Sequence, residues 1–184
     1  MKRYLIVFFA IIAFAFIVSC DSNVNKQEDD MDGASGYTIE TEYAYGYRID
    51  NYIDPVSGNK VKSIQYNAIT GKKIKDTFYN EDGSKSQERE FNSDNGKVIK
   101  ATFYFQNGSK RVIENNSAGK VIKSTDFNAD GIKTEETDYN PSTGIRIRET
   151  FFHTNGISSK VIEYDPETGE KVKETNYDTE GNVI

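Results

Sequence analysis

Few side chains in this sequence could do acid–base, nucleophilic or redox chemistry. The 184 residues include one histidine, His153, and one cysteine, Cys20. Catalysis by such groups needs a partner base and an orienting third group, and no Ser, Cys or acid constellation accompanies His153. It stands in the segment FHTNG, where similar segments carry Asn or Asp, so we expect a turn residue. A lone cysteine excludes an intramolecular disulfide framework.

Paired carboxylates are the next candidates, because two acids can hydrolyse a glycosidic bond. Glu135-Glu136 and Glu88-Arg89-Glu90 place acids close together. Acids recur with the same spacing along the chain, however, which favours solvated strand faces with ion pairs. The sequence carries no P-loop, dinucleotide fingerprint or metal-ligand cluster. We therefore expect no cofactor, no metal and no enzymatic activity.

The N-terminal segment predicts export. It reads MKRYLIVFFAIIAFAFIVSC, with Lys2 and Arg3 ahead of an uncharged apolar run over residues 4–18. Fifteen residues would form a helix of roughly 22 Å, shorter than the ~30 Å hydrocarbon core of a bilayer. A signal peptide over residues 1–19 therefore fits better than a permanent anchor helix.

The end of that run resembles the bacterial lipobox, an aliphatic-small-small-Cys pattern. Here it reads Ile17-Val18-Ser19-Cys20. The resemblance implies cleavage before Cys20, a diacylglycerol on its thiol, and a location outside the cytoplasm at a bacterial membrane or cell surface. The alternative is an unprocessed signal anchor with an incidental cysteine.

Residues 20–36 predict a disordered acidic tether behind the lipidated cysteine. Residues 21–36 hold five acids and one lysine, and they contain too little apolar surface to offset the entropy of ordering. Glu28, Asp30 and Asp32 match positions 1, 3 and 5 of a calcium loop, but position 12, which needs a glutamate, would be Ile39. A solvated spacer is the better interpretation.

The net charge argues against nucleic acid as a partner. Beyond residue 20 the chain has 21 Lys and Arg against 29 Asp and Glu, a net charge of −8. Phosphate backbones and anionic lipid headgroups would both repel such a body. We expect the membrane to be contacted through the lipid on Cys20.

A glycine repeat dominates the rest of the chain. Eleven glycines recur 11 to 13 residues apart, and an aromatic residue precedes almost every one by four to six residues. The unit before Gly119 has Asn115 at the aromatic place. The glycines are Gly58, Gly71, Gly83, Gly96, Gly108, Gly119, Gly131, Gly144, Gly156, Gly169 and Gly181.

Each repeat predicts one strand and one hairpin turn. Segments such as NPSTG, DPETG and NEDG are typical of turns in which glycine supplies a positive φ and a bulge. The residues that follow alternate and are rich in Ile, Val, Thr and aromatics, as strands are. The sequence therefore predicts an all-β antiparallel meander of about 11–12 strands over residues 37–184, with one leading strand in 37–50 and further strands from Tyr52.

The turns have two lengths that alternate, so the full repeat is a 25-residue hairpin. The turn before Gly119 should be long by this rule and is short, which predicts an irregularity there. Each strand face has one or two apolar residues among charges; after Gly169 one face carries Lys171, Lys173 and Thr175. We therefore expect an elongated, partly single-layered sheet instead of a sandwich or closed barrel.

The pattern YNxxTGxKIKxTxYNxDG over residues 52–184 resembles the MORN-variant repeats of secreted and lipidated bacterial proteins. It is more distantly similar to the YD repeats of RHS-type proteins. Some MORN-variant proteins resemble antitoxin or immunity partners, and the resemblance implies that role as an alternative function.

The sequence as a whole favours a non-catalytic, lipid-anchored protein of the cell envelope that serves as a structural or binding surface. Its rows of Tyr and Phe could stack on envelope glycan or bind a protein, or they could pack across strands in a thin core. A short last strand, ending at Ile184, predicts a soluble monomer with weak edge-to-edge dimers at high concentration. The alternative is the immunity or antitoxin-like partner of a toxin.

Overall fold

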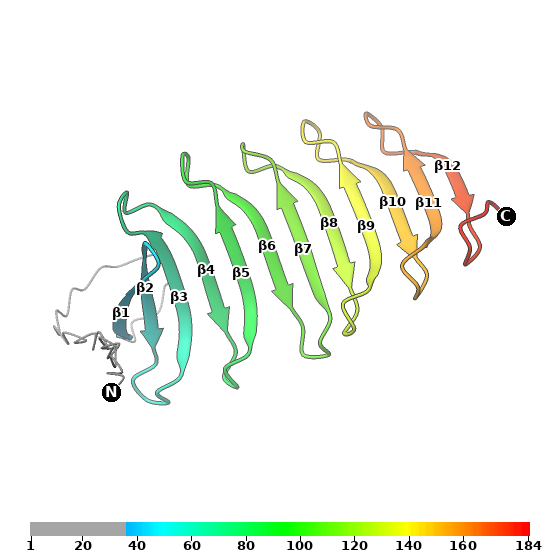
Figure 1. Ribbon diagram of the computed structural model, residues 1–184. Coiled ribbons are helices and arrows are strands. Elements are labelled where there is room, and N and C mark those ends of the chain that lie inside the picture. The colour runs from blue at the N-terminus through cyan, green and yellow to red at the C-terminus, as the bar shows by residue number, and fades with distance from the viewer. Residues whose placement is uncertain (1–35) are drawn as a thin grey trace, which may run out of the picture. The chain divides into compact units, whose positions relative to one another are not determined.

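The computed structural model describes residues 36–184, so the predicted signal peptide, Cys20 and almost all of the predicted tether lie outside the described residues. Twelve antiparallel strands form one sheet, and they lie side by side in chain order (Figure 1). This confirms the predicted all-β meander. The strands are β1 Thr38–Ala44, β2 Tyr47–Ile53, β3 Lys60–Asn67, β4 Lys73–Tyr79, β5 Lys85–Phe91, β6 Val98–Tyr104, β7 Lys110–Asn115, β8 Val121–Phe127, β9 Lys133–Tyr139, β10 Arg146–Phe152, β11 Ser158–Tyr164 and β12 Lys171–Asn176.

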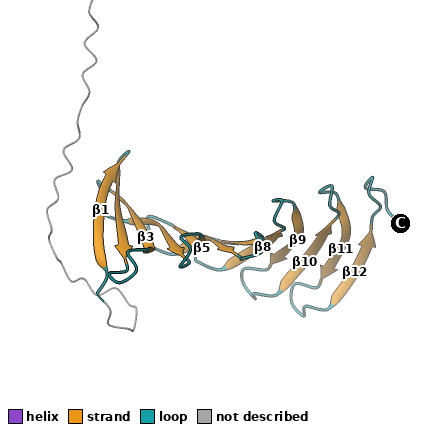
Figure 2. Ribbon diagram, turned by 90° about the horizontal axis from the view of Figure 1, so that it is seen from below, coloured by secondary structure: helices purple, strands orange, loops and turns teal. Residues whose placement is uncertain are grey.

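The sheet is open and consists of a single layer. Viewed from below, neither face is covered by a second sheet or a helix in the described part of the chain (Figure 2). None of residues 36–184 belongs to a helix that is long and apolar enough to cross a membrane. Every strand therefore meets its neighbours only through hydrogen bonds and cross-strand side-chain pairs.

The first two strands correct one expectation. Residues 37–50 were expected to form a single leading strand, but they contain β1, a turn and the start of β2. Tyr45 and Gly46 form that turn with φ of 51° and 83°. Two-residue turns with positive φ favour Asn-Gly or Asp-Gly, so Tyr-Gly carries a weak turn signal. Gly46 nevertheless precedes Gly58 by 12 residues and extends the glycine series.

The later turns follow two hydrogen-bond patterns. In the short type, the Gly83 N–H donates to the Asn80 carbonyl at 2.9 Å; in the long type, the Gly71 N–H reaches back one residue further, to Asn67 at 2.9 Å. All eleven repeat glycines have φ between 67° and 91°. The long turns precede Gly58, Gly71, Gly96, Gly144 and Gly169, and the other six are short.

The turn before Gly119 is short although its edge of the sheet otherwise has long turns from Gly71 onward. The step from Gly108 to Gly119 is 11 residues, whereas the equivalent step from Gly131 to Gly144 is 13. One of these two residues is missing from the turn before Gly119, which is one residue shorter than the turn before Gly144. The second residue is missing from the start of β7. The β6–β7 pair therefore lacks the register shift seen in β4–β5, β8–β9 and β10–β11.

The core consists of the middle residues of the strands. Its buried apolar side chains are Ile64, Ala101, Val161 and Ile162. Polar side chains outnumber them, and threonines recur at the centre of β4, β6, β8 and β10 on one face. The buried polar residues are Asp76, Thr77, Thr102, Thr125, Thr137, Glu149 and Thr150. Such a thin core agrees with the sparse apolar content of each strand face.

Candidate functional site

A row of alternating charge crosses one face of the sheet, which we call the ladder face. In the strand register, cations on even-numbered strands lie directly opposite acids on odd-numbered ones from β4 to β12. Two of these opposed pairs are ion pairs in the described residues: Lys123 lies 3.2 Å from Asp138, and Lys100 lies 3.7 Å from Glu90. The row contains Lys75, Glu90, Lys100, Glu114, Lys123, Asp138, Arg148, Glu163 and Lys173.

The paired carboxylates singled out from the sequence serve this network. Glu88 contacts Lys75 at 2.6 Å and Lys85 at 2.7 Å. Burial by itself would raise the pKa of the Glu88 carboxyl, but these two lysines outweigh it and hold the pKa below its ordinary value. Glu136 has the same arrangement, and strand alternation turns Glu135 to the other face. A general acid needs a raised pKa, so this environment favours ion pairing.

Most repeat aromatics are covered by cations. A Lys or Arg at or near the start of one strand lies over the ring at or near the end of the next strand; for example, Arg146 lies 4.4 Å from the Tyr164 ring centroid. These contacts support the cross-strand packing alternative for the aromatic rows. The six pairs are Arg48 with Tyr66, Lys60 with Tyr79, Lys73 with Phe91, Lys110 with Phe127, Lys133 with Phe152, and Arg146 with Tyr164.

A buried carboxylate on β4 is the most enclosed charged group among residues 36–184. The Asp76 side chain is fully buried, accepts two hydrogen bonds from Arg89 at 2.9 and 2.7 Å, and lies 2.8 Å from the Lys73 ammonium. Burial would raise the pKa of Asp76, but the hydrogen bonds from Arg89 and Lys73 lower it below its usual range. Two cations on one carboxylate make this a structural charge cluster.

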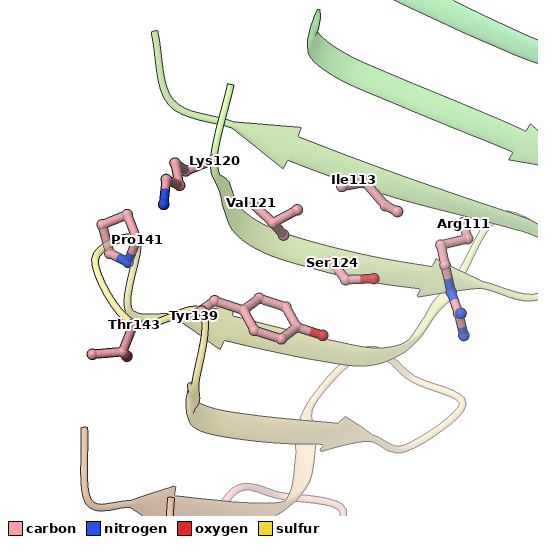
Figure 3. A pocket seen from close by; sticks show the side chains of 9 residues that line it. Arg111, Ile113, Lys120, Val121, Ser124, Tyr139, Pro141 and Thr143 are labelled. Carbon is pink, nitrogen blue, oxygen red and sulfur yellow. The ribbon is translucent and has the colours of Figure 1, made fainter. Parts of the chain in front are cut away.

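A shallow hollow of about 430 Å³ lies over β7, β8 and β9. Ile113, Val121 and Tyr139 line it, with Lys120 at one end and Arg111 at the other (Figure 3). The hollow adjoins the Gly119 turn, where the chain is two residues shorter than the repeat predicts. It could hold a small polar molecule, but Arg111 is already bound to Asp126 at 2.7 and 2.8 Å.

Uncovered tyrosines gather instead on the β1–β2 hairpin. Tyr43 is 73% exposed, Tyr45 is fully exposed and Tyr47 is 37% exposed. The pairing of Tyr43 with Arg48 places Tyr43 and Tyr47 on opposite faces, with Tyr45 at the tip between them. Tyr45 also holds a left-handed φ of 51°, a conformation that costs a non-glycine residue about 1 kcal/mol or more. We call these three residues the tyrosine tip.

Sequence reasoning did not identify the tyrosine tip, because it placed Tyr43, Tyr45 and Tyr47 within one leading strand. The density of tyrosine in TEYAYGYRIDNY, together with Gly46, was the available signal. His153, the histidine singled out from the sequence, lies in the turn between β10 and β11. His153 occupies a short turn, where its carbonyl accepts from the Gly156 N–H at 2.9 Å and its Nε2 lies 3.0 Å from the Tyr177 carbonyl.

Two predictions concern residues that the structure leaves out. Cys20 and its lipidation lie outside the described residues, as do Glu28, Asp30 and Asp32 of the calcium-like spacing. Within residues 36–184, no group of three or more His, Cys, Asp or Glu side chains is arranged to hold a metal ion.

The fold and its side-chain pattern define a single-layer β-repeat protein, and comparison with known families agrees with the repeat. Residues 85–126, 127–176 and 152–184 each match the family described as "Protein of unknown function (DUF2963)". These matches span residues 85–184, more than half of the sequence. The chain belongs to this family. No curated protein matches it.

Three of the solved structures that resemble this chain share limited likeness with it. An S. aureus TarM variant in complex with fondaparinux, alpha-GlcNAc-glycerol and UDP is 12% identical over 54% of this chain and 19% of its own, with a TM-score of 0.41. TarM itself is 16% identical over 59% and 20%, with the same score. A porin-like protein from Bacteroides uniformis is 11% identical over 75% and 56%, with a score of 0.30. The chain thus spans about a fifth of the TarM chains.

Proposed function

We propose that this protein is a non-catalytic, lipid-anchored binding surface of the bacterial cell envelope, with the tyrosine tip as its contact site for an envelope glycan or a protein. The observation that carries the proposal is the contrast in aromatic exposure. Most of the recurring aromatics are covered by cations, whereas Tyr43 and Tyr45 are 73% and 100% exposed at a hairpin end.

Exposed tyrosines suit such a role on physical grounds. Each ring offers a flat apolar face and a hydroxyl at low entropy cost, so it can stack on a sugar ring or enter an apolar pocket of a protein. Tyr45 combines a positive φ with a fully exposed side chain, which contributes nothing to the core. Strain held at a residue that does not pack is a reason to look for binding there.

Binding to purified peptidoglycan tests the proposal. The paired change Tyr43→Ala and Tyr45→Ala should weaken sedimentation with peptidoglycan about tenfold, since two rings at ~0.5–1.5 kcal/mol each approach 1.4 kcal/mol or more. Phe replacements at the same two positions should keep most of the affinity. Phe105→Ala is the matched control, because Phe105 is 50% exposed in another turn.

Capture of a protein in place of peptidoglycan, lost in the same Ala variant, would identify a protein ligand. If that protein were a toxin, the immunity-partner alternative would be favoured. Unchanged binding of every ligand by the Ala variant would contradict a role for the tyrosine tip. The likeness to MORN-variant repeats stays a prediction and does not decide between these ligands.

The anchor has its own test. Cys20→Ala should move the protein from the membrane fraction to an unprocessed or released form, because two or three acyl chains hold a protein at a bilayer firmly. Mass spectrometry of the native N-terminus should find residues 1–19 removed and an acyl adduct on Cys20. Retention of residues 1–19 without an adduct would contradict the lipoprotein prediction.

A further inference from the structure

The two outer strands of the sheet carry complementary halves of the charge row. Each even-numbered strand from β4 to β12 contains a cation, any residue, then threonine. Lys123 and Thr125 on β8, for example, pair with Asp138 and Glu136 on β9. Similarly, Lys75 and Thr77 on β4 pair with Glu90 and Glu88 on β5. On β12 the same motif is Lys173 and Thr175, and β12 is the last strand of the sheet within residues 36–184.

The acids that would pair with the β12 motif are found on β1, at the other end of the sheet. β1 contains Glu40 and Glu42, spaced as Glu88 and Glu90 are on β5. The strand pairings place Glu42 in the row that leads through Ile49, Gln65 and Lys75 and continues to Lys173. Glu40 lies in the neighbouring row that continues through Thr77 to Thr175, also on the ladder face.

We propose that copies of this protein associate head to tail, with β1 of one copy adding to β12 of the next as a thirteenth strand that pairs Glu42 with Lys173 and Glu40 with Thr175. Consecutive strands are antiparallel, so β1 and β12 run in opposite directions and the added strand has the correct sense. The second copy keeps its ladder face on the same side, and the row of alternating charge continues across the junction.

Within residues 36–184, no further strand pairs with the outer edge of β1 or of β12. Six of the seven residues of β1 are exposed, as are Lys171, Val172 and Lys173 on β12. Within residues 36–184, Glu40, Glu42 and Lys173 form no ion pair, although the Glu42 carboxylate accepts a hydrogen bond from the Asn51 amide at 3.2 Å. Unpaired strand edges with uncompensated charge of opposite sign attract each other.

The C-terminal residues limit the length of the junction. Val183 bridges Tyr177, and the Ile184 N–H donates to the Asn176 carbonyl at 3.0 Å. These residues occupy the first positions of the added strand, so the incoming β1 pairs only from Glu40 onward, with Lys171 to Thr175. An interface of about five residue pairs is small, so the association should be weak and should depend on concentration.

The charges also select against other pairings. Two β1 strands side by side would bring Glu40 and Glu42 of both copies together, and two β12 strands would do the same with Lys171 and Lys173. Like charges directly opposite are destabilising in a sheet. The favoured contact is therefore heterologous, and such a contact extends into an open row of copies instead of closing a dimer. The junction uses the backbone edge of β1, including that of Tyr43, which it pairs with Val172, whereas Tyr45 and Tyr47 of the tyrosine tip lie beyond the paired residues.

Exchange of charges between two variants tests the proposal. Using the full chain in detergent, Lys173→Glu and Glu42→Lys should each abolish concentration-dependent oligomers in analytical ultracentrifugation, because each variant alone places like charges opposite each other in the β12–β1 junction. An equimolar mixture of the two should restore oligomers, because every junction between unlike variants again joins a cation to an acid at these two positions. Restoration also shows that both variants fold. Lys120→Glu, the same charge change in an exposed turn away from both edges, should associate as the unchanged protein does.

A zero-length carbodiimide cross-link locates the contact. In a mixture of isotope-labelled and unlabelled protein, an amide between the Lys173 ammonium and the Glu42 or Glu40 carboxylate should join peptides of different labels. β1 and β12 lie at opposite ends of the sheet, so this link cannot form within one copy (Figure 1). Absence of oligomers at any concentration, failure of the mixture to associate, or links joining β1 only to β1 would overturn the proposal.

Discussion

Asp76 shows how a single residue stabilises a sheet that has almost no apolar core. Its carboxylate lies between Arg89 and Lys73, and Arg89 in turn lies 5.1 Å from the Phe78 ring centroid. One buried acid thereby joins β4 and β5 through charge, hydrogen bonds and an aromatic contact. Removing one partner from such a cluster leaves the remaining charged groups desolvated and unpaired, which lowers the free energy of unfolding.

We expect Asp76→Asn to lower the free energy of unfolding at pH 7 by about 1–3 kcal/mol. The pKa of Asp76 is lower in the folded than in the unfolded chain, so its contribution is complete above about pH 4 and is lost as the pH falls through the folded pKa. Denaturant titrations between pH 2 and 7 should therefore show a shallower acid loss in the variant.

Asp94→Asn is the control for this change, since Asp94 is 92% exposed and lies 3.8 Å from Lys72. It should alter neither the stability at pH 7 nor the acid slope. Equal acid slopes for the unchanged protein and Asp76→Asn would show that Asp76 carries no pH-dependent stability.

The turn glycines give a second residue-level prediction. A Cβ at Gly131 or Gly144 would meet no atom within 4 Å, so a valine there costs only backbone strain, about 1 kcal/mol or more at φ of 78° and 76°. Gly131→Val and Gly144→Val should lower the denaturation midpoint clearly, because they lie between coupled hairpins. Gly181→Val should change it little, since only a terminal stub follows.

Ser142→Val, in the same turn as Gly144, should be nearly neutral because that turn position tolerates most side chains. Negligible effects at Gly131, Gly144 and Gly181 alike would mean that positive φ at these glycines does not limit stability.

Three strands, β4, β9 and β10, each contribute a cation that contacts two other side chains. Lys73, Lys133 and Arg146 each contact an acid three residues later on the same strand and a ring on the next strand. The bulge near the strand start brings residues three apart onto one face. This recurring arrangement stabilises a single layer strand by strand.

Arg146→Met tests this contribution. Its acid, Glu149, is 9% exposed and also accepts a hydrogen bond from the Tyr164 hydroxyl, whose pKa is raised to about 12, first by burial and then by that acid. We expect a loss of about 1–2 kcal/mol, which includes the cation–π contact with Tyr164. Thermal unfolding at pH 7 measures it.

Lys171→Met is the matched control, because Lys171 pairs with Glu174, whose side chain is 36% exposed. Exposed pairs contribute little, so the change should stay within about 0.5 kcal/mol. Equal losses at Arg146 and Lys171 would indicate that burial of the acid does not matter.

The whole sheet is an array in which every strand contacts only its neighbours. Stability is then roughly a sum over adjacent strand pairs. A complete hairpin unit can be removed if the remaining strands keep the same residues opposite each other. Residues 146–170 form such a unit of 25 residues, from the start of β10 to the position before β12.

Deletion of residues 146–170 should give a folded protein with a lower unfolding midpoint. It places β9 beside β12, with Asp138 facing Lys173 as it now faces Arg148. Deletion of residues 147–170, one residue shorter, should misfold or aggregate, because a shift of one residue turns every side chain of β12 to the other face. Far-UV circular dichroism and thermal unfolding distinguish the two deletion variants. If both fold with equal cooperativity, the cross-strand rows of side chains do not set the register of β12.

The sequence determined the repeat, the meander and the two turn types, including the short turn at Gly119. These features depend on residues within a few positions of each other: a turn carbonyl, its Asn or Asp, and a glycine with positive φ. Local chemistry of this kind can be recognised in the sequence without knowing which strands pair. The thin core followed in the same way, from the few apolar residues on each strand face.

Only the tertiary structure decided which side chains meet across strands. Arg146 and Tyr164 are 18 residues apart, and their contact depends on the register shifts near the strand ends, which spacing alone does not reveal. The hairpin at Tyr45-Gly46 was missed because its turn lacks Asn or Asp. The tyrosine tip and the complementary outer strands exist because the sheet stays open, and cross-strand pairing over the whole molecule sets that outcome.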